Sequence, residues 1–207
     1  MTRLAFACLF AALISFVHPA HAGQFNPVLN IGDAAPAWSN LPGTDGKSHS
    51  LADLKDKDAV VVVFTCNSCP VAADYEDRII AMAKKFADPQ GKAAVVAINV
   101  NKIPEDSLEK MRERAEAKGF PFPYLFDESQ KIAKDYGATF TPEFFVLNRE
   151  RKIVYMGGMD DNSNPAEVKT NYLDAGIEAA IAGSKPATTE TVARGCMIRY
   201  ARERRRN

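Results

Sequence analysis

An uninterrupted hydrophobic run that passes directly into an amphipathic helix is the feature of this sequence that most constrains its fold. The run is Ala59–Phe64 (AVVVVF), and its β-branched residues predict a central strand buried on both faces of a sheet. From Pro70 onward, apolar residues recur at steps of three and four, which places them on one face of a helix. They are Ala72, Tyr75, Ile79, Met82, Ala83 and Phe86. The chain therefore turns from strand to helix between residues 64 and 70.

Two cysteines separated by two residues occupy this junction, in the stretch FTCNSCPVA at residues 64–72. At the first turn of a helix, unpaired backbone N–H groups and the positive end of the dipole stabilise a thiolate. The spacing brings the second sulfur within reach of the first, so that a mixed disulfide with a substrate can be resolved internally. We predict Cys66, nearer the loop, as the nucleophile and Cys69 as the resolving thiol.

The pattern that follows alternates between strand and helix. Residues 93–100 (AAVVAINV) predict a second buried strand. Residues 104–118 carry acids early and bases late, the order that a helix dipole favours, and Gly119 ends the segment. This alternation predicts an α/β unit with a mostly parallel core.

The second half of the chain predicts an antiparallel addition to that unit. Residues 127–136 indicate a short helix closed by Gly137. Glu143–Leu147 and residues 152–156 are separated by a turn and predict a hairpin, and Tyr172–Ala182 predicts the last helix.

The first 22 residues have the pattern of a secretory signal peptide. A short positive start precedes the apolar stretch at residues 4–17, and Ala20-His21-Ala22 has the A-x-A form of a cleavage site. The apolar stretch is shorter than the ~20 residues that span a bilayer. We therefore expect a periplasmic or secreted protein with no stable membrane span once residues 1–22 are removed.

Removal of this segment would leave three cysteines, Cys66, Cys69 and Cys196, and one histidine, His49. A zinc site needs further cysteine or histidine ligands that are scarce here, and covalent haem attachment needs histidine directly after the pair, where Pro70 stands. An inert structural disulfide across so small a loop would add little constraint to the unfolded chain. We expect no metal and no cofactor.

Charge argues against a nucleic-acid partner, because 26 basic residues balance 26 acidic ones. The C-terminal tail, residues 184–207, carries Cys196 and a basic end. For the basic end, residues 199–206, we predict a solvated tail, with an anionic lipid or partner surface as the alternative. For Cys196 two readings stay open: a third redox thiol that pairs transiently with Cys66 or Cys69, or an incidental thiol.

Thr141-Pro142 lies directly before a strongly β run. Proline is unfavourable at such a position unless it forms a turn or a cis peptide bond, so this dipeptide makes a family resemblance specific. The order of elements over residues 30–182 resembles the thioredoxin fold. The resemblance implies a central mixed β-sheet flanked by helices within a domain at residues 23–183. It also implies that Pro142 is cis beside the cysteine pair, and that Thr141 offers backbone groups to a substrate.

Within that superfamily, the lead-in at residues 31–54 is similar to the redoxin family, which holds peroxiredoxins and exported thiol-disulfide oxidoreductases. The C-N-x-C-P motif resembles its peroxiredoxin-like group. Two departures stand out. Val62 and Cys66 occupy positions where the peroxidase pattern has proline and threonine, and Thr65 and Ala72 replace the tryptophan and acid common around the pair.

We therefore expect an exported thiol-disulfide oxidoreductase that exchanges disulfides with protein substrates through Cys66 and Cys69. Its partners would be protein thiols or disulfides and an upstream thiol donor or acceptor, and Thr141 and Pro142 would shape the substrate groove. The alternative is a peroxiredoxin-like thiol peroxidase that uses Cys69 or Cys66, with Cys196 resolving. A third reading is a binding module insensitive to redox state.

Overall fold

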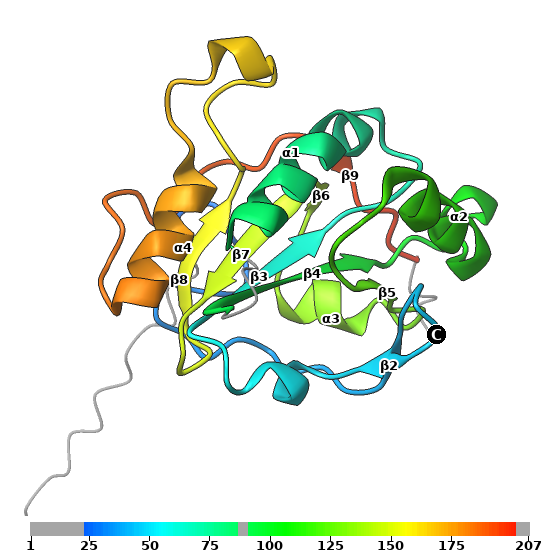
Figure 1. Ribbon diagram of the computed structural model, residues 1–207, viewed down its shortest axis with the longest axis horizontal. Helices are drawn as coiled ribbons and strands as arrows, with labels where there is room; N and C mark the ends of the chain where they lie inside the picture. Colours follow the sequence, from blue (N-terminus) through cyan, green and yellow to red (C-terminus); the bar gives the residue numbers. More distant parts are fainter. Residues whose placement is uncertain (1–22, 87–90, 202–207) are drawn as a thin grey trace, which may run out of the picture.

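The computed structural model describes residues 23–86 and 91–201, and the predicted signal peptide lies outside them (Figure 1). Within this part of the chain, one five-stranded sheet forms the centre of the molecule, in the order β5-β4-β3-β7-β8. Its strands are β3 (Ala59–Phe64), β4 (Ala93–Asn99), β5 (Tyr124–Phe126), β7 (Glu143–Leu147) and β8 (Ile153–Gly157).

The sheet is mixed, and β3 lies at its middle. β3 pairs in parallel with β4, which pairs in parallel with β5. On the other side β3 pairs antiparallel with β7, and β7 with β8. All six residues of β3 are buried, as expected for a strand covered on both faces. The thioredoxin-like mixed sheet is therefore confirmed.

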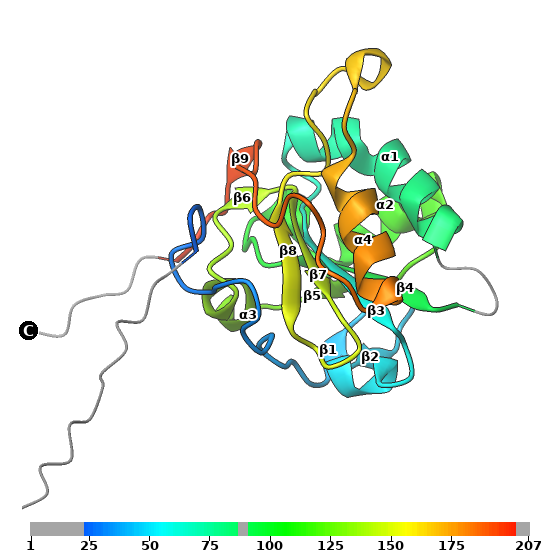
Figure 2. The ribbon, with the colours of Figure 1, turned by 90° about the vertical axis from the view of Figure 1, so that its left-hand side faces the viewer.

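Helices cover both faces of this sheet, which Figure 2 shows edge-on. The main helices are α1 (Pro70–Phe86), α2 (Leu108–Lys118), α3 (Lys131–Asp135) and α4 (Tyr172–Ala182). α1 and α4 pack on one face through a cluster that includes Ile79, Phe144 and Ile177. α3 and the N-terminal lead-in, with Trp38, pack on the opposite face. The amphipathic stripe predicted for the first helix is the surface that contacts the sheet.

Short elements complete the described chain. They are β1 (Leu41–Pro42), β2 (Ser48–His49), η1 (Leu51–Leu54), η2 (Pro104–Asp106), β6 (Phe140–Thr141), η3 (Pro165–Glu167) and β9 (Cys196–Met197). β1 pairs with β2 in a small hairpin, and β6 pairs with β9.

Two local expectations were wrong, and one strand was not predicted. Residues 104–118 do not form one helix, because Ser107 has an extended backbone that separates η2 from α2 and caps α2 by accepting the Lys110 N–H. The helix expected at residues 127–136 is shortened to Lys131–Asp135, since the Asp127 carboxylate instead accepts N–H groups of the preceding turn and of Ile132. The short strand β5 was not expected.

The C-terminal residues that the structure describes lie against the domain. β9 pairs with β6, and Ile198 is buried in the cluster that also holds Trp38 and Tyr136. The predicted boundary at residue 183 stays a prediction, and most of the basic end lies outside the described residues. Among the described residues, no helix combines the length and the apolar character needed to cross a membrane.

Candidate thiol redox site

The cysteine pair lies between the end of β3 at Phe64 and the start of α1 at Pro70. Cys69 directly precedes the helix, and its carbonyl accepts the Ala73 N–H at 3.0 Å, so it is the capping residue. Its Sγ accepts the Ala72 N–H at 3.3 Å. The stabilisation by the helix start therefore falls on Cys69, whereas Cys66 lies three residues earlier, in the loop.

A buried carboxylate holds the loop between the two cysteines. Asp106, fully buried, accepts hydrogen bonds from the Asn67 N–H (2.8 Å), the Ser68 N–H (3.0 Å) and the Ser68 hydroxyl (2.7 Å). Asn101 donates a fourth at 3.1 Å. Sequence reasoning missed this residue, because it assigned Asp106 to the charged face of a helix and nothing local points to a contact 38 positions away.

Thr141 lies between the two cysteines. Its hydroxyl Oγ1 is 3.4 Å from the Sγ of Cys66, and its carbonyl oxygen is 3.1 Å from the Sγ of Cys69. The Thr141-Pro142 peptide bond is cis, as the resemblance implied. The structure thus brings together four of the residues singled out from the sequence, Cys66, Cys69, Thr141 and Pro142.

Cys196 also lies at this site. β9 pairs antiparallel with β6 so that Cys196 stands opposite Thr141. The Sγ atoms of Cys69 and Cys196 are 2.6 Å apart, and the Thr141 hydroxyl donates to the Cys196 carbonyl at 3.4 Å. Of the two pairings considered for Cys196, the structure places it beside Cys69. No sequence signal selects that partner, since 127 positions separate the two residues.

The thiols differ in their electrostatic surroundings. Burial raises the pKa of Cys66, and the nearby charge of Asp106 adds to this. For Cys69, burial also raises the pKa, but contacts with Cys196, the Ala72 N–H and Thr141 outweigh it, so the pKa falls below its ordinary value. The contact with Cys69 raises the pKa of Cys196 to about 11. In this arrangement Cys69 is the thiol most readily ionised, whereas Cys66 is the thiol predicted from the sequence as the nucleophile.

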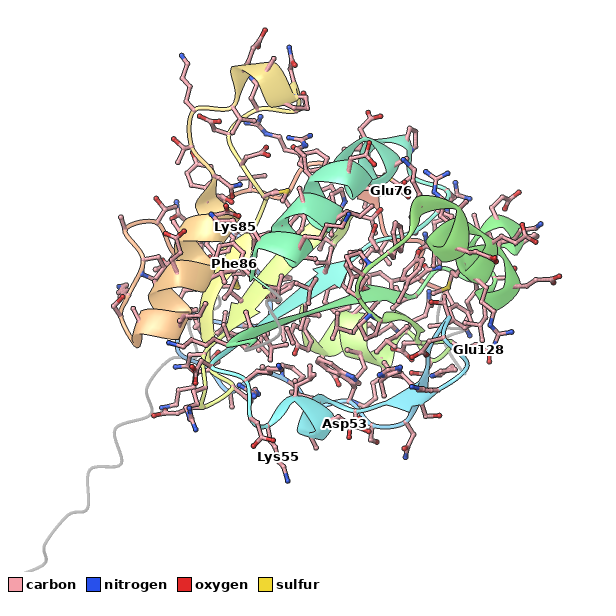
Figure 3. All side chains as sticks on the ribbon, in the orientation of Figure 1. Asp53, Lys55, Glu76, Lys85, Phe86 and Glu128 are labelled. Carbon is pink, nitrogen blue, oxygen red and sulfur yellow. The ribbon has the colours of Figure 1, made fainter. Side chains whose placement is uncertain are left out.

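The acidic residues on α1 do not serve the thiols directly. Glu76, labelled in Figure 3, lies on the side of α1 that faces α2, where Arg114 binds it at 2.8 Å through two nitrogens. Asp74 is exposed. The buried acids closer to the site are Asp106 and Glu143, whose carboxylate accepts the Thr139 and Phe140 N–H groups beside β6. Of these two, Asp106 is the acid whose charge acts on a thiol, that of Cys66.

Among the described residues, no group of three or more histidine, cysteine or acidic side chains is placed to hold a metal ion. His49 pairs with Asp45 at 3.0 Å on the β1–β2 hairpin. Chemically, the site offers three sulfur atoms arranged around one threonine.

Comparison with known proteins shows the family of this chain. The AhpC/TSA family profile matches residues 31–156. A Mycobacterium tuberculosis (strain H37Rv) protein provisionally named a peroxiredoxin is 32% identical over 110 residues, 53% of this chain. The match spans 65% of that relative's length, just under two thirds.

Solved structures give the same fold. The crystal structure of an uncharacterised conserved protein from Geobacillus kaustophilus has a TM-score of 0.79 at 33% identity, covering 86% of this chain and 96% of its own. A thiol:disulfide interchange protein of the thioredoxin family from Chlorobium tepidum has a TM-score of 0.57 at 21% identity, covering 72% of this chain and 97% of its own. The second likeness shows the fold alone.

Proposed function

This chain belongs to the AhpC/TSA family, and on that premise we propose that it is an exported thiol-disulfide oxidoreductase acting on protein substrates through Cys66 and Cys69. One observation carries the proposal: the sulfur atoms of both cysteines lie within 3.4 Å of Thr141, the residue before the cis proline. A substrate segment that pairs with the backbone at Thr141 would present its own sulfur to both thiols. Export rests on the pattern of residues 1–22 and is tested by fractionation and N-terminal sequencing of the mature chain.

The exchange proceeds in two balanced steps. The Cys66 thiolate attacks one sulfur of a substrate disulfide, forming a mixed disulfide and releasing the other sulfur as a thiolate. The Cys69 thiolate then attacks the Sγ of Cys66, which releases the reduced substrate and leaves a Cys66–Cys69 disulfide. Two electrons pass from the chain to the substrate, and an external dithiol returns them. Run backwards, the same steps oxidise a substrate.

A second function is favoured by the lowered pKa of Cys69 and by the Cys196 sulfur next to it. In a thiol peroxidase, the Cys69 thiolate would attack a peroxide oxygen, giving a sulfenic acid and releasing water or an alcohol. The Cys196 thiol would then condense with the sulfenic acid to form a disulfide and release water. This route needs Cys69 and does not need Cys66.

Single-thiol variants separate the two functions. Dithiothreitol-driven reduction of insulin disulfides should be lost in Cys66→Ser if the chain exchanges disulfides, and the Cys69→Ser variant should accumulate a mixed disulfide on Cys66. Rapid-quench oxidation of the reduced protein by hydrogen peroxide should be slow in that case. Fast peroxide oxidation that survives Cys66→Ser and disappears in Cys69→Ser would instead establish the peroxidase and overturn the first function.

A further inference from the structure

The C-terminal segment at residues 193–201, here termed the strap, is held at the redox site by specific contacts. The Ile198 N–H donates to the Thr139 carbonyl at 2.9 Å, and the Arg199 N–H donates to Asn101 Oδ1 at 2.9 Å. The buried Gln130 side chain bridges the strap and the domain: its amide donates to the Val100 and Arg199 carbonyls, and its oxygen accepts the Ala201 N–H at 2.7 Å. These bonds hold Cys196 in register opposite Thr141, where Figure 2 shows β9 beside β6.

Gly195 lets the strap approach this closely. A Cβ atom at that position would lie 2.0 Å from the Thr141 carbonyl oxygen and 2.7 Å from its carbonyl carbon. Both atoms belong to backbone, which cannot move aside as a flexible side chain could. A residue without a side chain directly before Cys196 is therefore what allows the two sulfur atoms to meet.

We propose that Cys196 is a third redox thiol, which attacks the Cys66–Cys69 disulfide at Cys69 and forms a Cys69–Cys196 disulfide. The strap that carries Cys196 then closes the substrate position at Thr141. The geometry carries this inference in two ways. The Sγ atoms of Cys69 and Cys196 are 2.6 Å apart, against about 2.05 Å in a disulfide bond, so small side-chain motion suffices. In addition, β9 occupies the edge of β6 where an extended substrate segment would have to pair.

The transfer leaves the net redox state of the chain unchanged, because Cys196 is oxidised while Cys66 is reduced. Starting from the Cys66–Cys69 disulfide, the Cys196 thiolate attacks the Sγ of Cys69. The Cys69–Cys196 bond forms, the Cys66–Cys69 bond breaks, and Cys66 leaves as a thiolate that takes up a proton from water. The strap is then covalently closed over Thr141. An external dithiol that attacks Cys196, which is more exposed than Cys69, reduces the disulfide. Hydrogen bonds alone then hold the strap, and a substrate segment can displace it from β6.

Disulfide mapping tests the assignment without any activity assay. The reduced full-length mature chain is equilibrated with oxidised glutathione, quenched in acid, alkylated with N-ethylmaleimide, digested and analysed by mass spectrometry. The Cys69–Cys196 linkage should predominate, with Cys66 alkylated, and Cys66→Ser should keep it. A predominant Cys66–Cys69 linkage with Cys196 alkylated, or a Cys66–Cys196 linkage, would overturn the proposal.

A glycine substitution tests the role of the strap. Gly195→Ala should lower the ratio of Cys69–Cys196 to Cys66–Cys69 at least about tenfold, because an overlap that costs 1.4 kcal/mol already has that effect. Met197→Ala is the matched control, since the Met197 side chain is 73% exposed and its truncation should leave the ratio unchanged. An unchanged ratio in Gly195→Ala would contradict the steric argument. Because Cys66→Ser leaves the strap sequence intact, its mapping stands even if Gly195→Ala fails to fold.

The proposal rests on the disulfide exchange proposed above, but the two can fail separately. If Cys66–Cys69 forms, insulin reduction proceeds and Cys196 stays free, the third thiol is wrong and the exchange stands. If Cys69–Cys196 forms and the reduced protein reduces no protein disulfide, the exchange is wrong while the assigned linkage stands. Limited proteolysis adds a readout of closure: cleavage within residues 193–201 should be slower in the oxidised protein than in the reduced one. Equal rates would contradict closure.

Discussion

Ser68 donates two hydrogen bonds to the carboxylate of Asp106, one from the Ser68 backbone N–H at 3.0 Å and one from the Ser68 hydroxyl at 2.7 Å. Ser68 lies between the two cysteines, so an acid on another segment fixes the conformation of the redox loop. The same negative charge contributes, after burial, to the raised pKa of Cys66. One buried side chain thus affects both the shape and the ionisation of the site.

Asp106→Asn should therefore lower the pKa of Cys66 while weakening the loop. The variant removes the charge that opposes thiolate formation, whereas burial still keeps the pKa raised. The asparagine side chain also accepts fewer hydrogen bonds than the carboxylate from the buried donors around it. The free energy of unfolding should therefore fall by about 1–3 kcal/mol. The rate of iodoacetamide alkylation against pH, measured in a Cys69→Ser, Cys196→Ser background, reports Cys66 alone.

The exposed neighbour Glu105 supplies a matched control for this change. Glu105→Gln removes a charge from the same turn but none of the bonds to Asn67 or Ser68, and it should leave loop stability unchanged. An alkylation profile of Asp106→Asn that is unchanged, or displaced to higher pH, would contradict the electrostatic role assigned to Asp106.

Thiolate titration should assign the lowest thiol pKa to Cys69. Burial raises the pKa of Cys69, but its contacts with Cys196 and the Ala72 N–H lower it more, whereas the pKa values of Cys66 and Cys196 are raised. Absorbance at 240 nm of the reduced protein should therefore show a first step below pH 9. That step should persist in Cys66→Ser and vanish in Cys69→Ser. Its survival in Cys69→Ser would show that another thiol ionises first.

Glu143 should make stability depend on pH. Burial raises its pKa above the ordinary 4.5, opposed in part by the Phe140 and Thr139 N–H groups. Between 4.5 and the folded pKa, the folded state binds more protons than the unfolded state, so stability falls as pH rises through this window. Relative to Glu143→Gln, the wild type should be most stable below pH 4.5. As pH rises, this relative stability should fall by about 1.4 kcal/mol for each pH unit that separates the folded pKa of Glu143 from 4.5. Urea unfolding between pH 4 and 8 measures this difference, and a difference that grows with pH would contradict it.

Tyr136→Phe should stabilise the fold. The Tyr136 hydroxyl is buried and has no hydrogen-bond partner among the described residues, while its ring packs edge-on against Phe64 and Phe145 at 5.4 and 5.1 Å. Phenylalanine keeps the ring contacts and removes the unsatisfied group, so unfolding should cost about 1 kcal/mol more. Tyr124→Phe is the matched control, since the Tyr124 hydroxyl donates to Asn67 at 3.2 Å and its loss should destabilise. Thermal unfolding compares the two, and destabilisation by Tyr136→Phe would contradict the prediction.

The regular elements around the cysteines could be predicted because their signals are local. The valine-rich run is buried as β3, and the stripe from Ala72 to Phe86 faces the sheet on α1. The resemblance to the thioredoxin fold implied a cis peptide bond before Pro142, and the structure contains that bond. Where tertiary contacts compete with local preference, the prediction was wrong or none was made. Asp106 turns inward to the loop at residues 67–68 and the chain breaks at Ser107, and Tyr124–Phe126 becomes a strand because β4 offers it an edge.

The sequence by itself determined that this chain has a thiol pair at a strand-to-helix junction, because periodicity and spacing are properties of neighbouring residues. Only the tertiary structure decided which thiol ionises first and which cysteine Cys196 contacts. A pKa depends on burial and on charges brought in from elsewhere, such as Asp106 for Cys66. The contact between Cys69 and Cys196 depends on β9 pairing with β6, which no local pattern encodes.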